Sequence, residues 1–525
     1  MNRLLFRYIA LVLLFAWYAC AQITPLTGGE KDITPPQVIK TIPGNNSTLV
    51  SPKKIYVEFD EFIKLNNIHK QFLSSPALKN TPKFKLKGKT LIIELSDTLL
   101  PNTTYTFSFG NSIVDITENN PAENFQYVFS TGKYIDSLEI SGNVVDAYTL
   151  KPDEKIFVLL YPNLSDTFFK TRPSYVGLTQ KDGSFTIKHI KNGNYRLLAL
   201  KDINNNYVYD LPGEKIGFLP EVLSVDSNRN DLHIRTYVAE DCMPKIKKTK
   251  QLESGAFLIE TENIQRNDFE AKMLYPNSPY TVYKNGDSLL IVAQNLNKND
   301  SVSLFIYNNQ FADTISYRYM PPKDSSVQIS LIKTKSVIPE PKFTFTSFLP
   351  FTVDSSKVIL LKDSMPEKFY AVKKTQNRWQ ISINNAEQRV YKLYFLPGAI
   401  KNFYNKANQD TLRFDLSVQD AANFGNLKVT VNPAFDSPYF IILKDKSQKE
   451  VLRTKTYTGK AEVDFKYLTP NSYSLYCVLD ENKNNLWDCG DVLNNRQPER
   501  VIGYKNNPVK ILQNWEQETE WNIMP

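Results

Sequence analysis

The chain has 525 residues, several times the usual size of a domain, so a single hydrophobic core is excluded and several domains are expected. Its 29 Tyr and 31 Phe stand beside Val, Ile and Thr in short alternating runs, which predicts an all-β protein. The formal charge of +8 is dispersed, and no stretch joins dense Lys and Arg to interleaved aromatics, so nucleic-acid binding is not expected.

Residues 1–19 have the pattern of a secretory signal peptide. Arg3 and Arg7 form a positive start, and an apolar run follows as far as Ala19. This run is shorter than the roughly 20 apolar residues that cross a bilayer, so we predict a cleaved signal and export from the cytoplasm.

Cys20 is the predicted lipidation site. The pair Ala19-Cys20 resembles a lipobox, which implies that the thiol of Cys20 carries a diacylglycerol. Trp17 departs from the aliphatic residue that is usual at its place in this motif. The alternative is ordinary cleavage after Ala21, which would release a soluble protein that begins at Gln22.

Residues 20–33 are predicted to form the lipid anchor and a flexible tether, because this Thr- and Gly-rich segment has no apolar period. The Asp that commonly retains lipoproteins at an inner membrane does not follow Cys20, which favours the outer membrane. The periplasmic and the cell-surface side both stay open.

The first folded unit is predicted over residues 34–132. It opens on TPPQVIKTIPGNNSTL, continues through KIYVEFDEFI and LLPNTTYTFSFG, and ends on NFQYVFSTG. These four segments, in this order, resemble the bacterial Ig-like domains of the SbsA type. The resemblance implies a β-sandwich that serves as a spacer or a binding module.

A second unit is predicted over residues 137–240. It contains LEISGNVVDAYT, IFVLLYP and GSFTIKHIKNGNYRLLALKD. This order of segments resembles the transthyretin-like or carboxypeptidase-regulatory sandwiches. The resemblance implies a spacing or regulatory module without peptidase chemistry.

The C-terminal half repeats these patterns. Segment 389–418 has the pattern of 103–132, and segment 468–491 has the pattern of 190–214. The two patterns recur in the same order, as in a duplicated pair of domains. We therefore predict a second Ig-like domain over 337–419 and a second transthyretin-like domain over 425–525. A β domain of uncertain type is predicted over 244–332, and the fold class is all-β, a tandem of β-sandwiches with an internally duplicated pair.

Two Asn-rich loops are the candidate metal sites. Asp and Asn occur at relative positions 1, 3, 5 and 9 of both DINNNYVYD and DENKNNLWD. Alternate oxygens in a tight loop converge on one centre, and all-oxygen ligation suits calcium. The alternative is a turn held by side-chain-to-backbone hydrogen bonds. The candidate ligands are Asp202, Asn204, Asn206, Asp210 and Glu214 in the first loop and Asp480, Asn482, Asn484, Asp488 and Asp491 in the second.

The cysteines show no metal-ligand spacing. Cys477 and Cys489 flank one loop, and an oxidising compartment would allow them to pair. The alternative for these two residues is a pair of buried free thiols. Cys242 has no assigned role.

These features predict a non-catalytic lipoprotein of the cell envelope that acts as a scaffold or accessory subunit for a protein partner in the outer membrane. The histidines, His69, His189 and His233, are scattered and stand near no Cys or carboxylate cluster, so neither a catalytic triad nor a zinc site is indicated.

Two other functions stay open at this stage. A glycan-binding lipoprotein would need an exposed aromatic platform, for which Tyr207, Tyr209 and Trp487 are the candidates. An enzyme would need a carboxylate site within residues 244–332, because that stretch has neither His nor Cys.

Overall fold

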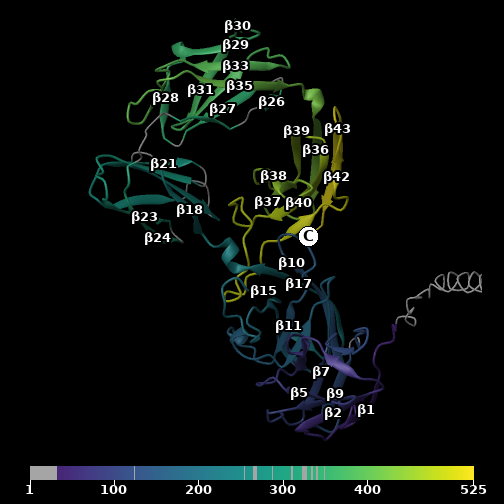
Figure 1. Ribbon diagram of the computed structural model, residues 1–525. Coiled ribbons are helices and arrows are strands. Elements are labelled where there is room, and N and C mark those ends of the chain that lie inside the picture. The colour runs from purple at the N-terminus through teal and green to yellow at the C-terminus, as the bar shows by residue number, and fades with distance from the viewer. Residues whose placement is uncertain are drawn as a thin grey trace, which may run out of the picture.

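The computed structural model describes residues 32–524, apart from 123–124, 253–254, 264–268, 286–287, 309–310, 322–327, 333–334, 338–340 and 348. The described residues confirm the predicted all-β class, and their sheets follow one another along the chain as units 1 to 5, residues 38–130, 138–238, 245–318, 330–419 and 425–523 (Figure 1). Within the described ranges, no helix has the length and apolar character to cross a membrane. The predictions for residues 1–19 and for Cys20 lie outside the described residues.

Unit 1 is a sandwich in which some strands bury every second side chain and others bury consecutive ones. Its elements are β1 (Val38–Ile42), β2 (Lys54–Phe59), β3 (Ile63–Leu65), α2 (Ile68–Gln71), β4 (Leu73–Ser75), β5 (Lys83–Lys87), β6 (Thr90–Glu94), β7 (Thr104–Ser108), β8 (Ile113–Asp115) and β9 (Gln126–Ser130). One sheet has the order β1-β2-β6-β5 and another β4-β7-β9, while β3 pairs with β8. In β2, Ile55, Val57 and Phe59 are buried and the residues between them are exposed, which fixes the register.

Unit 4 repeats the topology of unit 1. Its elements are β25 (Ser330–Leu331), β26 (Lys335–Val337), β27 (Lys342–Thr346), β28 (Phe351–Val353), η4 (Ser355–Lys357), β29 (Val358–Lys362), β30 (Met365–Pro366), β31 (Phe369–Thr375), β32 (Arg378–Ile383), β33 (Val390–Phe395), β34 (Ile400–Asn402), β35 (Leu412–Gln419) and, after it, η5 (Ala421–Asn423). The order β25-β27-β32-β31 matches β1-β2-β6-β5, and the pair β28-β34 matches β3-β8. The run β35-β33-β29 matches β9-β7-β4, so the predicted duplication appears in the pairing of the strands.

Unit 2 is a sandwich of mixed strand direction. Its elements are β10 (Leu138–Asp146), β11 (Phe157–Tyr161), η1 (Phe168–Lys170), β12 (Tyr175–Leu178), β13 (Ser184–Ile190), β14 (Gly193–Lys201), β15 (Lys215–Phe218), β16 (Leu223–Val225), β17 (Arg229–Val238) and η2 (Ala239–Cys242). The strand order is β12-β11-β14-β15-β17-β10-β13, with β16 also on β14. The chain's first strand in this unit, β10, pairs with the last, β17, in parallel and with β13 antiparallel.

Unit 5 repeats the strand pairing of unit 2, except that the pair β15–β17 has no counterpart among the described strands. Its strands are β36 (Gly425–Pro433), β37 (Tyr439–Lys444), β38 (Glu450–Arg453), β39 (Ala461–Leu468), β40 (Asn471–Leu479), β41 (Val501–Gly503), β42 (Val509–Ile511) and β43 (Glu516–Ile523). Here β36 pairs with β43 in parallel and with β39 antiparallel, and the other sheet runs β38-β37-β40-β41 with β42 on β40. The second duplicated domain is therefore equivalent to the first strand by strand.

Unit 3 joins the two halves. Its strands are β18 (Lys245–Gln251), β19 (Ala256–Glu262), β20 (Glu270–Tyr275), β21 (Tyr280–Asn285), β22 (Ser288–Ala293), β23 (Ser301–Tyr307) and β24 (Ala312–Arg318). The sheets β18-β19-β22-β21 and β20-β23-β24 enclose one apolar core with Phe257, Ile291 and Leu304 inside.

Units 2 to 5 form a closed ring, and unit 1 precedes this ring in the chain. Figure 1 shows it passing from unit 2 through unit 3 (teal) and unit 4 (green), then returning as unit 5 (yellow) beside unit 2. Units 3 and 4 meet where Tyr404 Oη donates to the carbonyl oxygen of Ala293 at 3.2 Å. Units 5 and 2 meet where Gln497 Nε2 donates to the carbonyl oxygen of Phe218 at 2.9 Å. Residues 138–523 thus form a ring of four sandwiches, and its closing contact contains the candidate site.

Candidate functional site

The first Asn-rich loop joins β14 to β15 and folds around the carboxylate of Asp202. Its Oδ1 accepts hydrogen bonds from the backbone N–H groups of Asn204 at 3.1 Å and Asn205 at 2.6 Å. Its Oδ2 accepts from the backbone N–H of Tyr207 at 2.6 Å. Asn205 and Tyr207 have φ angles of 59° and 62°, the left-handed conformation that turns the chain back over the carboxylate. Burial raises the pKa of Asp202.

The rest of this loop converges on Asp210 and Glu214. The side-chain amides of Asn204 and Asn206 donate to the two carboxylate oxygens of Asp210, at 3.2 Å and 2.7 Å. Glu214 is fully buried, and its two oxygens accept from the backbone N–H groups of Ile203 and Asp210, both at 3.1 Å. The structure therefore brings the five predicted ligands together, with their carboxylate oxygens engaged by donors of the loop itself.

The second loop, between β40 and β41, repeats this arrangement. Asp480 is fully buried, and its oxygens accept from the backbone N–H groups of Asn484 at 2.9 Å and Asn485 at 3.1 Å. The amides of Asn482 and Asn484 donate to Asp488 Oδ2 at 2.7 Å and 3.0 Å. Four of the five predicted residues thus occupy the same places as their counterparts in the first loop.

The fifth residue of the second loop is Glu499, and not the predicted Asp491. Glu499 Oε1 accepts from the backbone N–H of Glu481 at 3.1 Å and Oε2 from that of Asp488 at 3.0 Å, as Glu214 does in the first loop. Burial raises the pKa of Glu499 to about 8. Asp491 Oδ1 instead accepts from the backbone N–H of Leu493 at 3.0 Å in a turn of its own.

A sequence signal for Glu499 does exist. Glu214 opens the segment EKIGF and Glu499 opens ERVIG, and in both copies the next strand, β15 or β41, begins within two residues. Counting from the aspartate at the first loop position misses Glu499, because the second loop is longer. Counting back from the following strand finds it.

Calcium binding stays a prediction. Among the residues that the structure describes, no three His, Cys, Asp or Glu side chains gather closely enough to hold a metal ion. A calcium ion would need the asparagine amides to turn their oxygens inward, because an NH₂ group donates hydrogen bonds and does not coordinate cations. The hydrogen bonds within both loops are those expected for the alternative to a calcium site, an Asn-rich turn held by its own side chains.

A disulfide adjoins the two loops. It joins Cys242, at the end of η2 after unit 2, to Cys489, which follows Asp488 in unit 5; the Cα atoms are 5.7 Å apart and the sequence separation is 247 residues. The suggested pairing of Cys477 with Cys489 is therefore wrong. Cys477 is a free cysteine inside the core of unit 5, and burial raises the pKa of its thiol.

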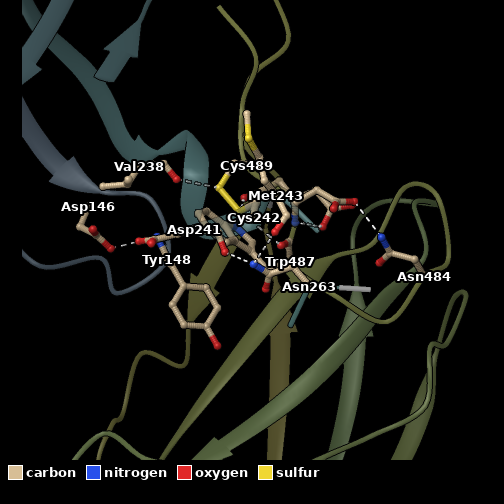
Figure 2. The surroundings of a disulfide bond; sticks show 12 residues. Asp146, Tyr148, Val238, Asp241, Cys242, Met243, Asn263, Asn484, Trp487 and Cys489 are labelled. Carbon is tan, nitrogen blue, oxygen red and sulfur yellow. Dashed lines mark hydrogen bonds between the residues drawn. A yellow bond between two sulfur atoms is a disulfide. The ribbon is translucent and has the colours of Figure 1, made fainter. Parts of the chain in front are cut away.

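Aromatic rings pack around this disulfide. Figure 2 shows Tyr148 of unit 2 and Trp487 of unit 5 beside it, and their ring centroids lie 5.0 Å apart. Lys444 Nζ lies 4.1 Å from the centroid of Tyr148 and 4.6 Å from that of Tyr476, a cation–π contact on both sides. Tyr237 and Cys489 are buried in the same apolar cluster. The interface thus combines a covalent bond with a desolvated aromatic core.

The aromatic platform proposed for glycan binding does not form. Tyr207 packs edge-on against Phe157 at 5.1 Å, and Trp487 packs on Tyr148 across the junction. Tyr207, Tyr209 and Trp487 are all partly buried against the apolar cluster that contains Tyr237 and Cys489, called the interface cluster below. Trp487 joins unit 5 to unit 2 through Tyr148, whereas Tyr207 packs on Phe157 within unit 2.

The histidines do not assemble a catalytic group. His69 lies in α2, where its ring packs against Phe84 at 5.7 Å. His189 lies in β13, with Nδ1 3.0 Å from the carbonyl oxygen of Asp136, and His233 lies in β17. His69 and His189 thus make a packing contact and a backbone contact, respectively.

Comparison with known proteins identifies one unit. Residues 32–131 match the family model of the bacterial Ig-like domain. No curated protein matches the chain. Among solved structures, domains 1–6 of the surface layer protein SbsC share 13% identity over 86% of this chain and 66% of that chain, with a TM-score of 0.15. The major pilin subunit of Bacillus cereus shares 11% identity over 74% and 99%, with a TM-score of 0.13, and a domain tandem of titin shares 15% over 44% and 94%, also with 0.13. Unit 1 therefore carries a bacterial Ig-like domain within a tandem of β-sandwiches.

Proposed function

We propose that the protein is a non-catalytic scaffold of the cell envelope, anchored to the outer membrane through Cys20, that holds a protein partner on the surfaces of its sandwiches. The observation that carries this proposal is the junction between units 2 and 5. Two units that are far apart in the sequence are joined by a disulfide and by an aromatic core, which makes the array of surfaces rigid.

The disulfide also supports a location in an oxidising compartment outside the cytoplasm. Disulfides persist in oxidising compartments and are rare in the cytoplasm. Export is what the pattern of residues 1–19 predicts from an independent part of the chain. A bacterial Ig-like domain directly after the predicted tether agrees with a spacer that starts at the membrane.

Affinity purification from solubilised envelope tests the scaffold. We expect a defined protein to co-purify with the intact chain, and to be lost when units 4 and 5 are deleted together. Single conservative substitutions of exposed acids, histidines or serines should leave both the partner and the biological activity in place. An enzyme would instead lose its activity through one polar substitution while every co-purifying protein remained.

Cys20→Ala tests the anchor separately. The variant should leave the membrane fraction and no longer incorporate labelled fatty acid. A variant that stays in the membrane and still carries the label would contradict the assignment of Cys20, without bearing on the scaffold.

A further inference from the structure

Two edge strands at opposite ends of the chain carry complementary rows of charge. On β5, the lysines at positions 83, 85 and 87 are exposed on one side of the strand. On β43, the glutamates at positions 516, 518 and 520 are exposed in the same alternation. Since side chains alternate along a strand, each row lies on one face, with about 7 Å between neighbours.

Both strands have an open edge among the described strands. β5 is the last strand of the order β1-β2-β6-β5 and pairs with β6 alone, and β43 is the last of β39-β36-β43 and pairs with β36 alone. The outer edge of each strand is therefore where a further strand can add.

Most residues of the two rows form no ion pair among the described residues, although each row has one neighbour of opposite charge on the adjacent strand: Glu94 beside the lysines and Lys428 beside the glutamates. Lys85 forms an ion pair with Glu94 at 2.8 Å. Lys83 and Lys87 form no ion pair among the described residues. Lys428 lies opposite Glu518 on the neighbouring strand, and its ion pair is with Glu462, at 3.3 Å. Within the part of the chain that the structure describes, the side chains that donate to Glu516 and Glu520 are the neutral amides of Asn426 and Asn432.

We propose that β5 of one copy of this chain docks against β43 of a second copy, so that the lysine row meets the glutamate row. The two rows share one period, and pairing in either strand direction sets all the lysines against all the glutamates. Opposite charges on facing strand positions stabilise a pair and like charges destabilise it. The contact between unlike edges is therefore favoured, while β5–β5 and β43–β43 contacts are disfavoured.

The partner edge must come from another chain. Figure 1 shows β5 in unit 1 at one end of the molecule and β43 in unit 5 well away from it. Trp515, directly before β43, is 56% exposed and offers an apolar anchor beside the charged row. Because the two surfaces differ, the contact is head-to-tail and repeats from copy to copy. This inference goes beyond the scaffold role, because it names one partner.

Charge reversal tests the contact in the mature chain with Cys20→Ser. Lys83 and Lys87 are the best positions, because their reversal leaves the Lys85–Glu94 pair in place. We expect the wild-type chain to self-associate in light scattering at low ionic strength and to dissociate in high salt. K83E/K87E and E516K/E520K should each raise the dissociation constant roughly tenfold or more.

Restoration identifies the partner. An equimolar mixture of K83E/K87E with E516K/E520K should associate again, because each variant now supplies the edge that matches the other. One chain with all four reversals should also self-associate. K446E/K449E, which reverses two exposed lysines on another turn of unit 5, is the matched control and should behave as wild type. Circular dichroism melts confirm that every variant is folded.

Two results would overturn the inference. One is a wild-type chain that stays monomeric at low ionic strength at every concentration. The other is a loss of association in the two variants that neither the mixture nor the fourfold variant restores, since the lysine row would then meet something other than the glutamate row. Neither result would affect the co-purifying partner, so the scaffold proposal is tested independently.

Discussion

At the residue scale, the contact between units 2 and 5 depends on Gly490. A Cβ atom at Gly490 would lie 2.6 Å from Tyr237 Cε1 and Cζ. The ring of Tyr237 is only 2% exposed and is enclosed by the interface cluster, so it cannot swing aside. Only a residue without a side chain lets unit 5 approach unit 2 this closely.

Gly490→Ala should therefore weaken the junction. Overpacking of this kind typically costs about 1–3 kcal/mol, and thermal unfolding should show a lower midpoint. The control is Gly503→Ala in the same unit, where the nearest atom to the new Cβ is Leu150 Cδ1 at an ordinary 3.5 Å. Equal melting curves for the two variants would show that the close approach to Tyr237 does not matter.

A second residue-scale feature is the ionic cluster on Lys215. Its Nζ lies 2.7 Å from Asp146 Oδ2 and 2.6 Å from Asp153 Oδ2, and all three side chains are largely buried. Burial opposes the ionisation of Asp146, but the hydrogen bonds from Lys215 and Thr149 outweigh it and lower the pKa of Asp146. The cluster ties β10 to β15 across the sandwich.

The pH dependence of this cluster has a defined sign. A carboxyl group whose pKa is lower in the folded than in the unfolded state stabilises the fold above its unfolded pKa, near 3.8, and this contribution is lost as the pH falls through the folded pKa. Asp146→Asn should cost about 2 kcal/mol at neutral pH, and the gap to wild type should narrow in acid. Asp166→Asn, at a carboxylate that is 89% exposed and 3.8 Å from Arg196, should change little at any pH. A constant gap for Asp146→Asn would contradict the pKa argument.

At the scale of elements, the two Asn-rich loops are a closely matched pair. Both connect equivalent strands, both place Asn amides on an aspartate, and both use a glutamate to accept backbone N–H groups. The left-handed residues also correspond, with Lys483 and Asn485 at φ 59° and 58° in the second loop. The same local geometry arises twice because the same polar groups must be satisfied.

The calcium prediction is tested most sharply in the second loop. Calcium that binds only the folded chain stabilises it by about 2.7 kcal/mol at a hundredfold excess over the dissociation constant, so the melting temperature should rise over that in chelator. Glu499→Gln should reduce this rise, whereas Asp491→Asn should leave it unchanged. Melting curves that are identical with calcium and with chelator would leave hydrogen-bonded turns as the whole explanation.

At the scale of the whole molecule, the chain is a closed ring with unit 1 projecting from it. The two cysteines of the disulfide are 247 residues apart in the sequence. Restricting so long a loop in the unfolded chain adds on the order of 5 kcal/mol to the free energy of unfolding in the chain-entropy model. The aromatic core of the junction adds to this. Units 2 and 5 should therefore move as one body.

Cleavage within the ring shows the closure directly. A protease site inserted at the exposed turn between Asp363 and Ser364 opens the chain between β29 and β30. The cleaved protein should run as one band on a denaturing gel without reductant and as two bands after reduction. Cys242→Ser should give two bands under both conditions. Two bands from the wild-type sequence without reductant would contradict the Cys242–Cys489 pairing.

The sequence by itself determined the all-β class, the duplicated topology and the position of both Asn-rich loops. Strand periodicity, turn residues and loop spacing are local properties, so they can be read from neighbouring positions, as in β2 and in DINNNYVYD. Tertiary structure alone decided that Cys489 pairs with Cys242, that Glu499 takes the place expected for Asp491, and that Trp487 is covered by Tyr148. Each of these outcomes depends on which surfaces meet after the chain has returned across two further units, or on how far a loop reaches before its next strand begins. No periodicity along the sequence encodes that meeting, because its stability comes from burial between residues that only the folded ring brings together.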